Sequence, residues 1–335
     1  MAHVVILMPA PPSADITADS QVQEGSVFAI KCSLTKSSAV WKGSTHHFNS
    51  SHILFHFHDE VVDPSRVRIR DESSAEMLLD PAKVTDSGYY YCYVAPPDGD
   101  TALVCSMRLE VGSPPSRIGQ ENMSCFSEDY ENLTCTWQTP DFHTKTHWTL
   151  RQYLLAGIAN ECPIVLSENS CRWTAHTHPA YRKHIPKLKM ALTIENRYGN
   201  LTELFTINHY EIIRPGKPAD VSIADVRSTS VELSWKTQHG FDFGGVREDD
   251  KSVPKLLYEV QVIPRSRSHE ARNLTTTSLG MNVTSLTPHT IYTFKIRCKT
   301  TEAKEDRMWS DVVDVSTETK ADGEFVICES CLLSG

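Results

Sequence analysis

Apolar and polar residues alternate with a period of two along much of the chain. The alternation is seen in Lys187–Ile194, Val231–Trp235 and Leu257–Val262. Successive side chains of an extended strand point to opposite faces, so each run predicts a strand with one buried face. Trp235 is expected in a core. The pattern predicts an all-β protein.

The alternating run near residue 294 gives the most specific expectation. It turns Tyr292, Phe294 and Ile296 toward a core. It leaves Lys295 and Arg297 on the outer face of the same strand. This pattern is typical of a sheet with one solvated face.

Two proline-rich stretches interrupt the alternation, at Val111–Pro115 and Ile212–Pro218. Proline has no backbone N–H for a central strand, so the first stretch predicts a short, stiff linker. In the second, two prolines bracket a glycine, which predicts a bend with limited swing. A chain of 335 residues divides naturally into three domains of about 100 residues each. We predict three β-sandwich domains in series, over residues 16–113, 114–214 and 215–320, between a flexible lead at 1–15 and a tail at 321–335.

Residues 125–137 contain two cysteines and a tryptophan at a distinctive spacing. Nine residues separate Cys125 from Cys135, and Trp137 follows at the next alternate position. On a strand, Cys135 and Trp137 share a face, and Cys125 lies one hairpin earlier, within reach of Cys135. A short disulfide beside an indole makes a compact core for a small sheet domain. A hairpin staple in an unrelated secreted β domain is the alternative.

Cysteines and glycosylation sequons together indicate an oxidising, secretory environment. The chain has ten cysteines and six Asn-x-Ser/Thr sequons. The sequon asparagines are Asn49, Asn122, Asn132, Asn200, Asn273 and Asn282. The net charge of −9 gives no support to nucleic-acid binding. No apolar run is long enough to cross a bilayer, so we expect no membrane insertion within this segment. The cysteines and sequons lead us to expect an extracellular chain.

Six residues of the first segment form a second constellation: Cys32, Trp41, Asp86, Gly88, Tyr90 and Cys92. The set resembles an immunoglobulin domain. The resemblance implies two sheets pinned by a Cys32–Cys92 disulfide over Trp41. It also implies that Tyr90, two residues before the second cysteine, forms the tyrosine corner. Such a domain serves as a recognition module or as a spacer, and the sequence leaves both open.

A second close cysteine pair follows residues 125–137, at Cys162 and Cys171, and precedes the run Lys187–Ile194 and a turn. This order resembles the amino-terminal module of the class I cytokine receptors. The resemblance implies the disulfides Cys125–Cys135 and Cys162–Cys171. Because an immunoglobulin-like segment precedes this module, the resemblance is to the interleukin-6 and interleukin-12 receptor branch of that family. Segments 114–214 and 215–320 are then expected to be fibronectin type III-like.

Residues 309–313 read Trp-Ser-Asp-Val-Val. The resembling receptors carry a Trp-Ser-x-Trp-Ser box here, whose indoles stack between guanidinium groups. The second indole and serine are absent, so the resemblance implies one rung, with Trp309 against Arg297, Lys295 or Arg265. A tryptophan on an exposed strand is the alternative. The residues assigned to this structural box are Trp137, Arg297, Trp309 and Ser310.

The resemblance implies an extracellular receptor subunit that recognises a four-helix-bundle cytokine at the elbow between the second and third domains. Other cytokine-receptor chains are the further partners, with JAK/STAT-type signalling. The chain is then secreted, or is the ectodomain of a receptor whose anchor is not in this sequence. The alternatives are a secreted cytokine-partner subunit or soluble decoy receptor, and an immunoglobulin/fibronectin cell-adhesion protein. The adhesion alternative predicts neither Cys125–Cys135 nor Cys162–Cys171.

In the resembling receptors, ligand contacts loops that converge at the elbow. Here these loops are residues 176–186, 236–255 and 300–308. Exposed aromatic side chains are frequent interface hot spots, and basic ones steer acidic partners. For the loop 236–255, a disordered segment with its phenylalanines folded back is the alternative. Tyr181, Phe241 and Phe243 are the expected anchors. The residues assigned to cytokine binding are Tyr181, Arg182, His184, Phe241, Phe243, Lys304, Arg307 and Met308.

No cofactor, metal or catalytic site is expected. The chain lacks a glycine-rich phosphate loop, a His-Glu-x-x-His motif and a Gly-x-Ser-x-Gly elbow, so we do not expect an enzyme. His56 and His58 share a strand face, but nothing supplies a third metal ligand, and a solvated polar edge is the better interpretation. The remaining four cysteines are assigned no disulfide partner; they are Cys105, Cys298, Cys328 and Cys331.

Overall fold

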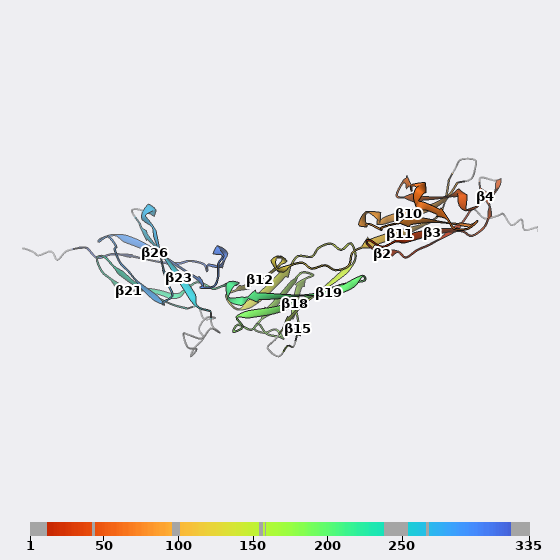
Figure 1. The fold of residues 1–335 in the computed structure, drawn as a ribbon. Coiled ribbons are helices and arrows are strands. Elements are labelled where there is room, and N and C mark those ends of the chain that lie inside the picture. The colour runs from red at the N-terminus through yellow and green to blue at the C-terminus, as the bar shows by residue number, and fades with distance from the viewer. Residues whose placement is uncertain are drawn as a thin grey trace, which may run out of the picture. The chain divides into compact units, whose positions relative to one another are not determined.

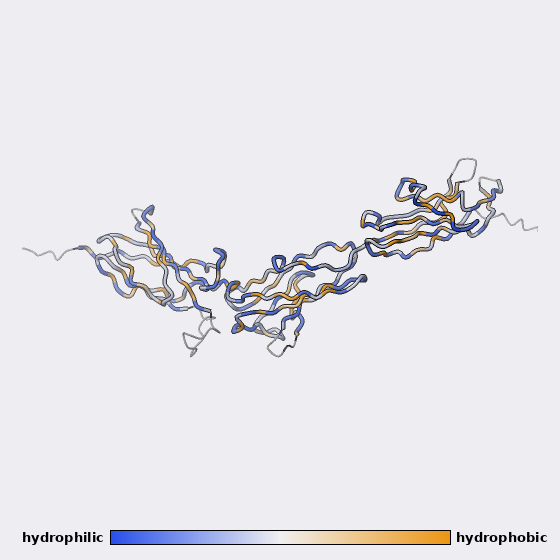
Figure 2. Tube along the Cα trace, in the orientation of Figure 1, coloured by the Kyte–Doolittle hydropathy of each residue, from blue (hydrophilic) through white to orange (hydrophobic). Residues whose placement is uncertain are grey.

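The computed structural model describes residues 12–41, 44–95, 101–153, 157, 159–237, 254–265 and 268–322 (Figure 1). Within these ranges the regular elements are β-strands and short 3₁₀ helices, which confirms the predicted all-β fold. Apolar and polar residues are interleaved along the strands (Figure 2). No helix in these ranges is long and apolar enough to cross a membrane.

Residues 14–112 contribute two main sheets and a small hairpin. The elements are β1 Ala14–Thr17, β2 Gln21–Gln23, β3 Phe28–Leu34, β4 Ser38–Trp41, β5 Ser44–His47, η1 Ser50–His52, β6 Ile53–Phe57, β7 Glu60–Val61, η2 Pro64–Arg66, β8 Val67–Ile69, β9 Ser74–Leu79, η3 Val84–Asp86, β10 Gly88–Val94 and β11 Ala102–Gly112. The sheet orders are β1-β3-β9-β8 and β2-β11-β10-β6-β7, and β4 pairs with β5. The first strand begins two residues before the predicted domain start at residue 16.

One disulfide and one tyrosine fix the core between these two sheets. The Cys32–Cys92 disulfide joins β3 to β10 and so links the sheets. Tyr90 Oη donates a 2.9 Å hydrogen bond to the Asp86 carbonyl, which is the geometry of a tyrosine corner. Trp41 ends β4, and its side chain lies outside the described part of the chain.

Residues 120–214 form a second pair of sheets. The elements are η4 Gln120–Asn122, β12 Met123–Glu128, β13 Asn132–Trp137, β14 Thr146–Tyr153, β15 Ala159–Glu161, β16 Ile164–Ser167, β17 Ser170–Thr174, β18 Lys187–Asn196, β19 Gly199–Asn208, η5 His209–Glu211 and β20 Ile213–Arg214. The orders are β16-β17-β13-β12-β20 and β15-β14-β18-β19. Disulfides Cys125–Cys135 and Cys162–Cys171 are both formed, and Cys135 and Trp137 are buried on one face of β13.

Residues 219–318 form the third pair. The elements are β21 Ala219–Val226, β22 Val231–Lys236, β23 Leu256–Pro264, η7 Ser268–Glu270, β24 Arg272–Thr276, β25 Gly280–Val283, β26 Ile291–Thr300, η8 Asp306–Met308 and β27 Val313–Glu318. The orders are β21-β22-β25 and β24-β23-β26-β27. Tyr292, Phe294 and Ile296 are buried as expected, and so is Trp235. Lys295 is exposed, because it lies on the opposite face of β26.

The chain divides into two compact units. One unit comprises residues 1–117, 140–148 and 193–202. The other comprises residues 118–139, 149–192 and 203–335. The domain boundaries expected at residues 113 and 214 stay a prediction.

Candidate ligand-binding site

Buried hydrogen bonds hold the segment that follows β19 against β26. The Tyr210 carbonyl accepts a 2.5 Å hydrogen bond from Thr300 Oγ1, and Thr300 is fully buried. The thiol of Cys298 lies 3.4 Å from the Gly216 carbonyl. Since the side chains of Thr300 and Cys298 are buried, breaking these contacts would leave buried polar atoms unpaired, which is costly. The segment 210–216 is therefore positioned by β26 itself.

Charged side chains of the same segment form ion pairs with the residues that follow β26. Glu211 lies 3.1 Å from Lys304 Nζ, and Arg214 Nη2 lies 2.6 Å from the Asp311 carboxylate. Arg214 Nε also donates to the Trp309 carbonyl at 3.1 Å. Lys304 is 83% exposed, and surface ion pairs of this kind contribute about 1 kcal/mol or less. These pairs orient the loop 300–311 more than they stabilise it.

The loop before β18 is anchored by a buried polar network centred on His209. His209 Nδ1 lies 2.7 Å from the Ile185 carbonyl, which can only accept. In the neutral ring Nδ1 therefore carries the proton, and Nε2 accepts a hydrogen bond from the Tyr181 hydroxyl. Ser127 Oγ lies 2.9 Å from the same hydroxyl oxygen. The network ties the loop 181–186 to η5, which leads directly into the segment held by β26.

Aromatic rings pack around this network. The ring centroid of His209 lies 5.7 Å from that of Tyr130 and 5.4 Å from that of Tyr181. The Tyr130 hydroxyl also donates to the Lys183 carbonyl. Burial lowers the pKa of His209 to about 4, although its bond to Ile185 acts in the opposite direction. The imidazole is therefore neutral at pH 7.

Two of the predicted ligand contacts are wrong because their side chains are buried. Tyr181, expected as an exposed anchor, is 6% exposed, because its hydroxyl finds partners inside the network. Met308 is 1% exposed, because η8 turns its side chain inward. Phe241 and Phe243 lie outside the described residues.

The basic residues predicted at the site are on the surface. Arg182 and His184 are exposed at the loop before β18. Arg307 is 58% exposed and pairs with Glu305. With Lys304, these side chains belong to the two loops that contact the segment 209–216. Arg182 and His184 lie on one of these loops, and Lys304 and Arg307 lie on the other.

Trp309 forms the rung expected from the reduced box. Its ring lies under two cations, with the Arg297 guanidinium carbon 4.7 Å and Lys299 Nζ 4.9 Å from the ring centroid. Arg297 Nε donates to Glu259 at 2.7 Å, which holds the guanidinium in place. The prediction included Arg297 but missed Lys299, although Lys299 continues the outward alternation along β26.

Ser310 joins the loop after η8 to β26. Its Oγ accepts a 2.9 Å hydrogen bond from the Cys298 N–H, and its own N–H donates to the Cys298 carbonyl at 2.7 Å. Burial raises the pKa of the Cys298 thiol to about 12. The serine of the box therefore has a structural role beside the tryptophan rung.

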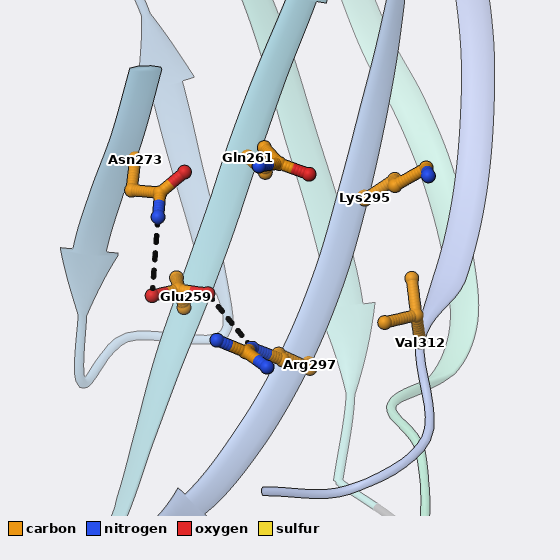
Figure 3. A pocket seen from close by; sticks show the side chains of 6 residues that line it. All are labelled: Glu259, Gln261, Asn273, Lys295, Arg297 and Val312. Carbon is orange, nitrogen blue, oxygen red and sulfur yellow. Dashed lines mark hydrogen bonds and ion pairs between the residues drawn. The ribbon is translucent and has the colours of Figure 1, made fainter. Parts of the chain in front are cut away.

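A hollow lies beside this rung on the outer face of the sheet (Figure 3). Its volume is about 210 Å³. Val312, which stands where the box of the resembling receptors has its second tryptophan, is on its rim. The lining residues are Glu259, Gln261, Asn273, Lys295, Arg297 and Val312. The hollow is consistent with a ladder that has lost one indole.

We predict that Trp309→Ala lowers the free energy of unfolding of the third pair of sheets by about 1–3 kcal/mol. The variant loses side-chain packing and the cation–π contacts with Arg297 and Lys299. Chemical denaturation measures the change. Val312→Ala is the matched control, since Val312 is apolar and 45% exposed, and it should change stability by about 0.5 kcal/mol or less. Equal melting of the parent and Trp309→Ala would show that the rung contributes nothing.

The predicted sequon asparagines all lie at least partly on the surface, as glycosylation requires. Asn49, Asn200, Asn273 and Asn282 are exposed, and Asn122 and Asn132 are partly exposed. Glycosylation itself stays a prediction.

His56 and His58 pack on aromatic rings. The His56 ring lies 4.5 Å from that of Tyr93, and the His58 ring lies 4.3 Å from that of Phe57. Within the described ranges, the group of ligand-type side chains close enough to hold a metal is Cys32, Cys92 and Cys105. Two of these are joined in a disulfide.

Comparison with known proteins shows that the chain is similar to several receptors. The fibronectin type III domain family matches residues 216–316. The leukemia inhibitory factor receptor of Canis lupus familiaris is 27% identical over 218 residues, covering 60% of this chain and 18% of that receptor. The interleukin-11 receptor subunit alpha of Homo sapiens is 26% identical over 182 residues, covering 50% of this chain and 42% of that subunit. A cytokine receptor of Drosophila melanogaster is 20% identical over 264 residues, covering 74% of this chain and 19% of that receptor.

The chain thus spans less than half the length of each of these relatives. All three are receptors by name, which agrees with the expectation that the chain is not an enzyme. Disulfides, an all-β fold and a fibronectin type III match accompany this similarity. The chain is therefore related to class I cytokine receptors of the interleukin-6 receptor family, and its residues 216–316 match the fibronectin type III domain family.

Proposed function

We propose that the chain is the cytokine-binding part of an extracellular receptor subunit. It recognises a four-helix-bundle cytokine where the loops 181–186 and 300–308 meet the segment 209–216, and it brings other receptor chains together. The relation to the leukemia inhibitory factor receptor and the interleukin-11 receptor supports the class of ligand.

The hydrogen bonds that fix two neighbouring residues, His209 and Tyr210, support this location of the site. The loop 181–186 is fixed by His209, and the next residue, Tyr210, is fixed by Thr300. Two loops from different sheets are therefore held in place before any ligand arrives. A preorganised surface loses less conformational entropy on binding, which favours affinity.

The surface charges suggest how the ligand is steered. Arg182, Lys304 and Arg307 are exposed basic residues of these two loops. Such residues mainly raise the association rate with an acidic partner. With Tyr181 and Met308 buried, the apolar anchors of the proposal are Phe241 and Phe243.

Surface plasmon resonance with the purified chain tests the proposal. The first probes are leukemia inhibitory factor, oncostatin M and interleukin-11, followed by the helical cytokines encoded in the same genome as the chain. We expect Arg182→Glu and Lys304→Glu to slow association about tenfold at low salt, with a smaller effect at high salt. Phe241→Ala and Phe243→Ala should each weaken affinity about 30-fold, which corresponds to about 2 kcal/mol.

Arg68→Glu is the matched charge control, because Arg68 is exposed on β8 in the other compact unit. It should leave binding unchanged. Parental binding by all four variants would show that the ligand binds at none of the loops 181–186, 236–255 and 300–308. Failure of every helical cytokine to bind would contradict the proposed ligand class.

A further inference from the structure

Three cysteine sulfurs meet in the core of the first pair of sheets. Cys32 and Cys92 form the disulfide between β3 and β10. Cys105, on β11, has its Sγ 3.9 Å from Cys32 Sγ. All three sulfur atoms lie within 4.8 Å of one another. The free thiol is therefore in contact with a sulfur of the disulfide.

The strand register explains why Cys105 is so close. Cys92 and Cys105 are directly opposite each other on the neighbouring antiparallel strands β10 and β11. Cys32 belongs to the other sheet, on β3. Cys32 thus faces two cysteines that stand side by side. A bond from Cys32 to either one would link the same two sheets.

We propose that Cys105 is an alternative disulfide partner of Cys32, and that the bond passes between Cys92 and Cys105 by thiol–disulfide exchange. The Cys105 thiolate attacks Cys32 Sγ, so the Cys32–Cys105 bond forms as the Cys32–Cys92 bond breaks. Cys92 leaves as a thiolate and takes up the proton that Cys105 released. One disulfide and one thiol are present before and after, and no oxidant is consumed.

The surroundings of Cys105 make this exchange slow near neutral pH. Burial, assisted by the carboxylate of Asp15 on β1, raises the pKa of the Cys105 thiol to about 11. Only the thiolate attacks, so it is scarce at pH 7 and increases about tenfold for each pH unit below that pKa. The Cys32–Cys92 form therefore persists after folding. Alkaline pH increases the thiolate fraction of Cys105 and so accelerates the exchange.

The decisive experiment removes the present partner. In the full chain carrying Cys92→Ser, we expect non-reducing peptide mapping to find Cys32–Cys105 as the main form of Cys32. The double variant Cys92→Ser/Cys105→Ser is the control and should show Cys32 fully accessible to alkylation after denaturation. The single variant Cys105→Ser should keep Cys32–Cys92. A secreted Cys92→Ser chain in which Cys32 and Cys105 are both alkylated would overturn the proposal.

A second measurement decides the matter if Cys92→Ser is not secreted. The parent chain is held at about pH 9.5, quenched with acid, denatured and alkylated. We expect a Cys32–Cys105 peptide, with alkylated Cys92, that accumulates with time and accumulates more slowly at pH 7. Cys298 is the internal control, because its buried thiol contacts Ser310 and Gly216 and should remain unpaired. A map that shows only Cys32–Cys92 at every pH and time would exclude the exchange.

Discussion

Acidification from pH 7 to pH 4 should destabilise the sheets around His209 by about 3 kcal/mol through this one side chain. The pKa of His209 is about 4 in the folded chain, below its ordinary value of 6.5. Between these two values the unfolded chain binds the proton and the folded chain does not. Stability is therefore complete above pH 6.5 and is lost as the pH falls toward 4.

Hydrogen exchange measured by mass spectrometry locates this loss. Peptides covering residues 181–186 and 205–212 should lose about 100-fold in protection between pH 7 and pH 4, after correction for intrinsic rates. His209→Gln keeps a hydrogen-bonding side chain without a titration near neutral pH, so its protection should depend less on pH. His269→Gln is the control, because His269 is 80% exposed, and it should behave as the parent does. The same pH dependence in parent and His209→Gln would assign the acid sensitivity to other groups.

The second large effect is expected from Cys135→Ser, which should retain the chain in the secretory pathway. The Cys125–Cys135 bond closes a sequence separation of 10 residues, and its loss costs about 3 kcal/mol in a chain-entropy model. Cys135 is fully buried, and its cross-strand neighbour on the other side is Cys171. A serine hydroxyl placed there has to find a hydrogen-bond partner in an apolar core, which adds about 1–3 kcal/mol.

Secretion yield and thermal melting measure the effect of Cys135→Ser. Thr136→Ser is the matched control, since Thr136 is the next residue on β13 and faces solvent. It should be secreted at the parental level. Normal yield and melting of Cys135→Ser would mean that this hairpin bond does not hold the second pair of sheets.

The sequence predicts well those features that depend on local periodicity. Alternation alone identified the buried face of β26, and it placed Arg297 outward, where Trp309 meets it. The two-residue spacing between Tyr90 and Cys92 likewise indicated a tyrosine corner, and Tyr90 indeed donates a hydrogen bond to the Asp86 carbonyl. In each case a strand period determines which way a side chain points, so the information lies within a few residues.

Loop side chains follow no such period, and there the prediction failed. Tyr181 looked exposed because it stands in a loop, but it is buried by His209, 28 residues later, and by Ser127, 54 residues earlier. An isolated histidine at position 209 gives no sequence signal of this partnership. Met308 was misplaced for a similar reason, since it ends a one-turn 3₁₀ helix, where no strand period applies, and its side chain is buried.

The position of Cys32 opposite two neighbouring strands has a consequence for how the chain can vary. In a sandwich with a single cross-sheet pair, a substitution of either cysteine removes the only covalent link. Here a chain that loses Cys92 still has Cys105 beside Cys32. A sequence lineage with this arrangement can shift its bridge from β10 to β11 by one substitution, without an intermediate that lacks a bridge.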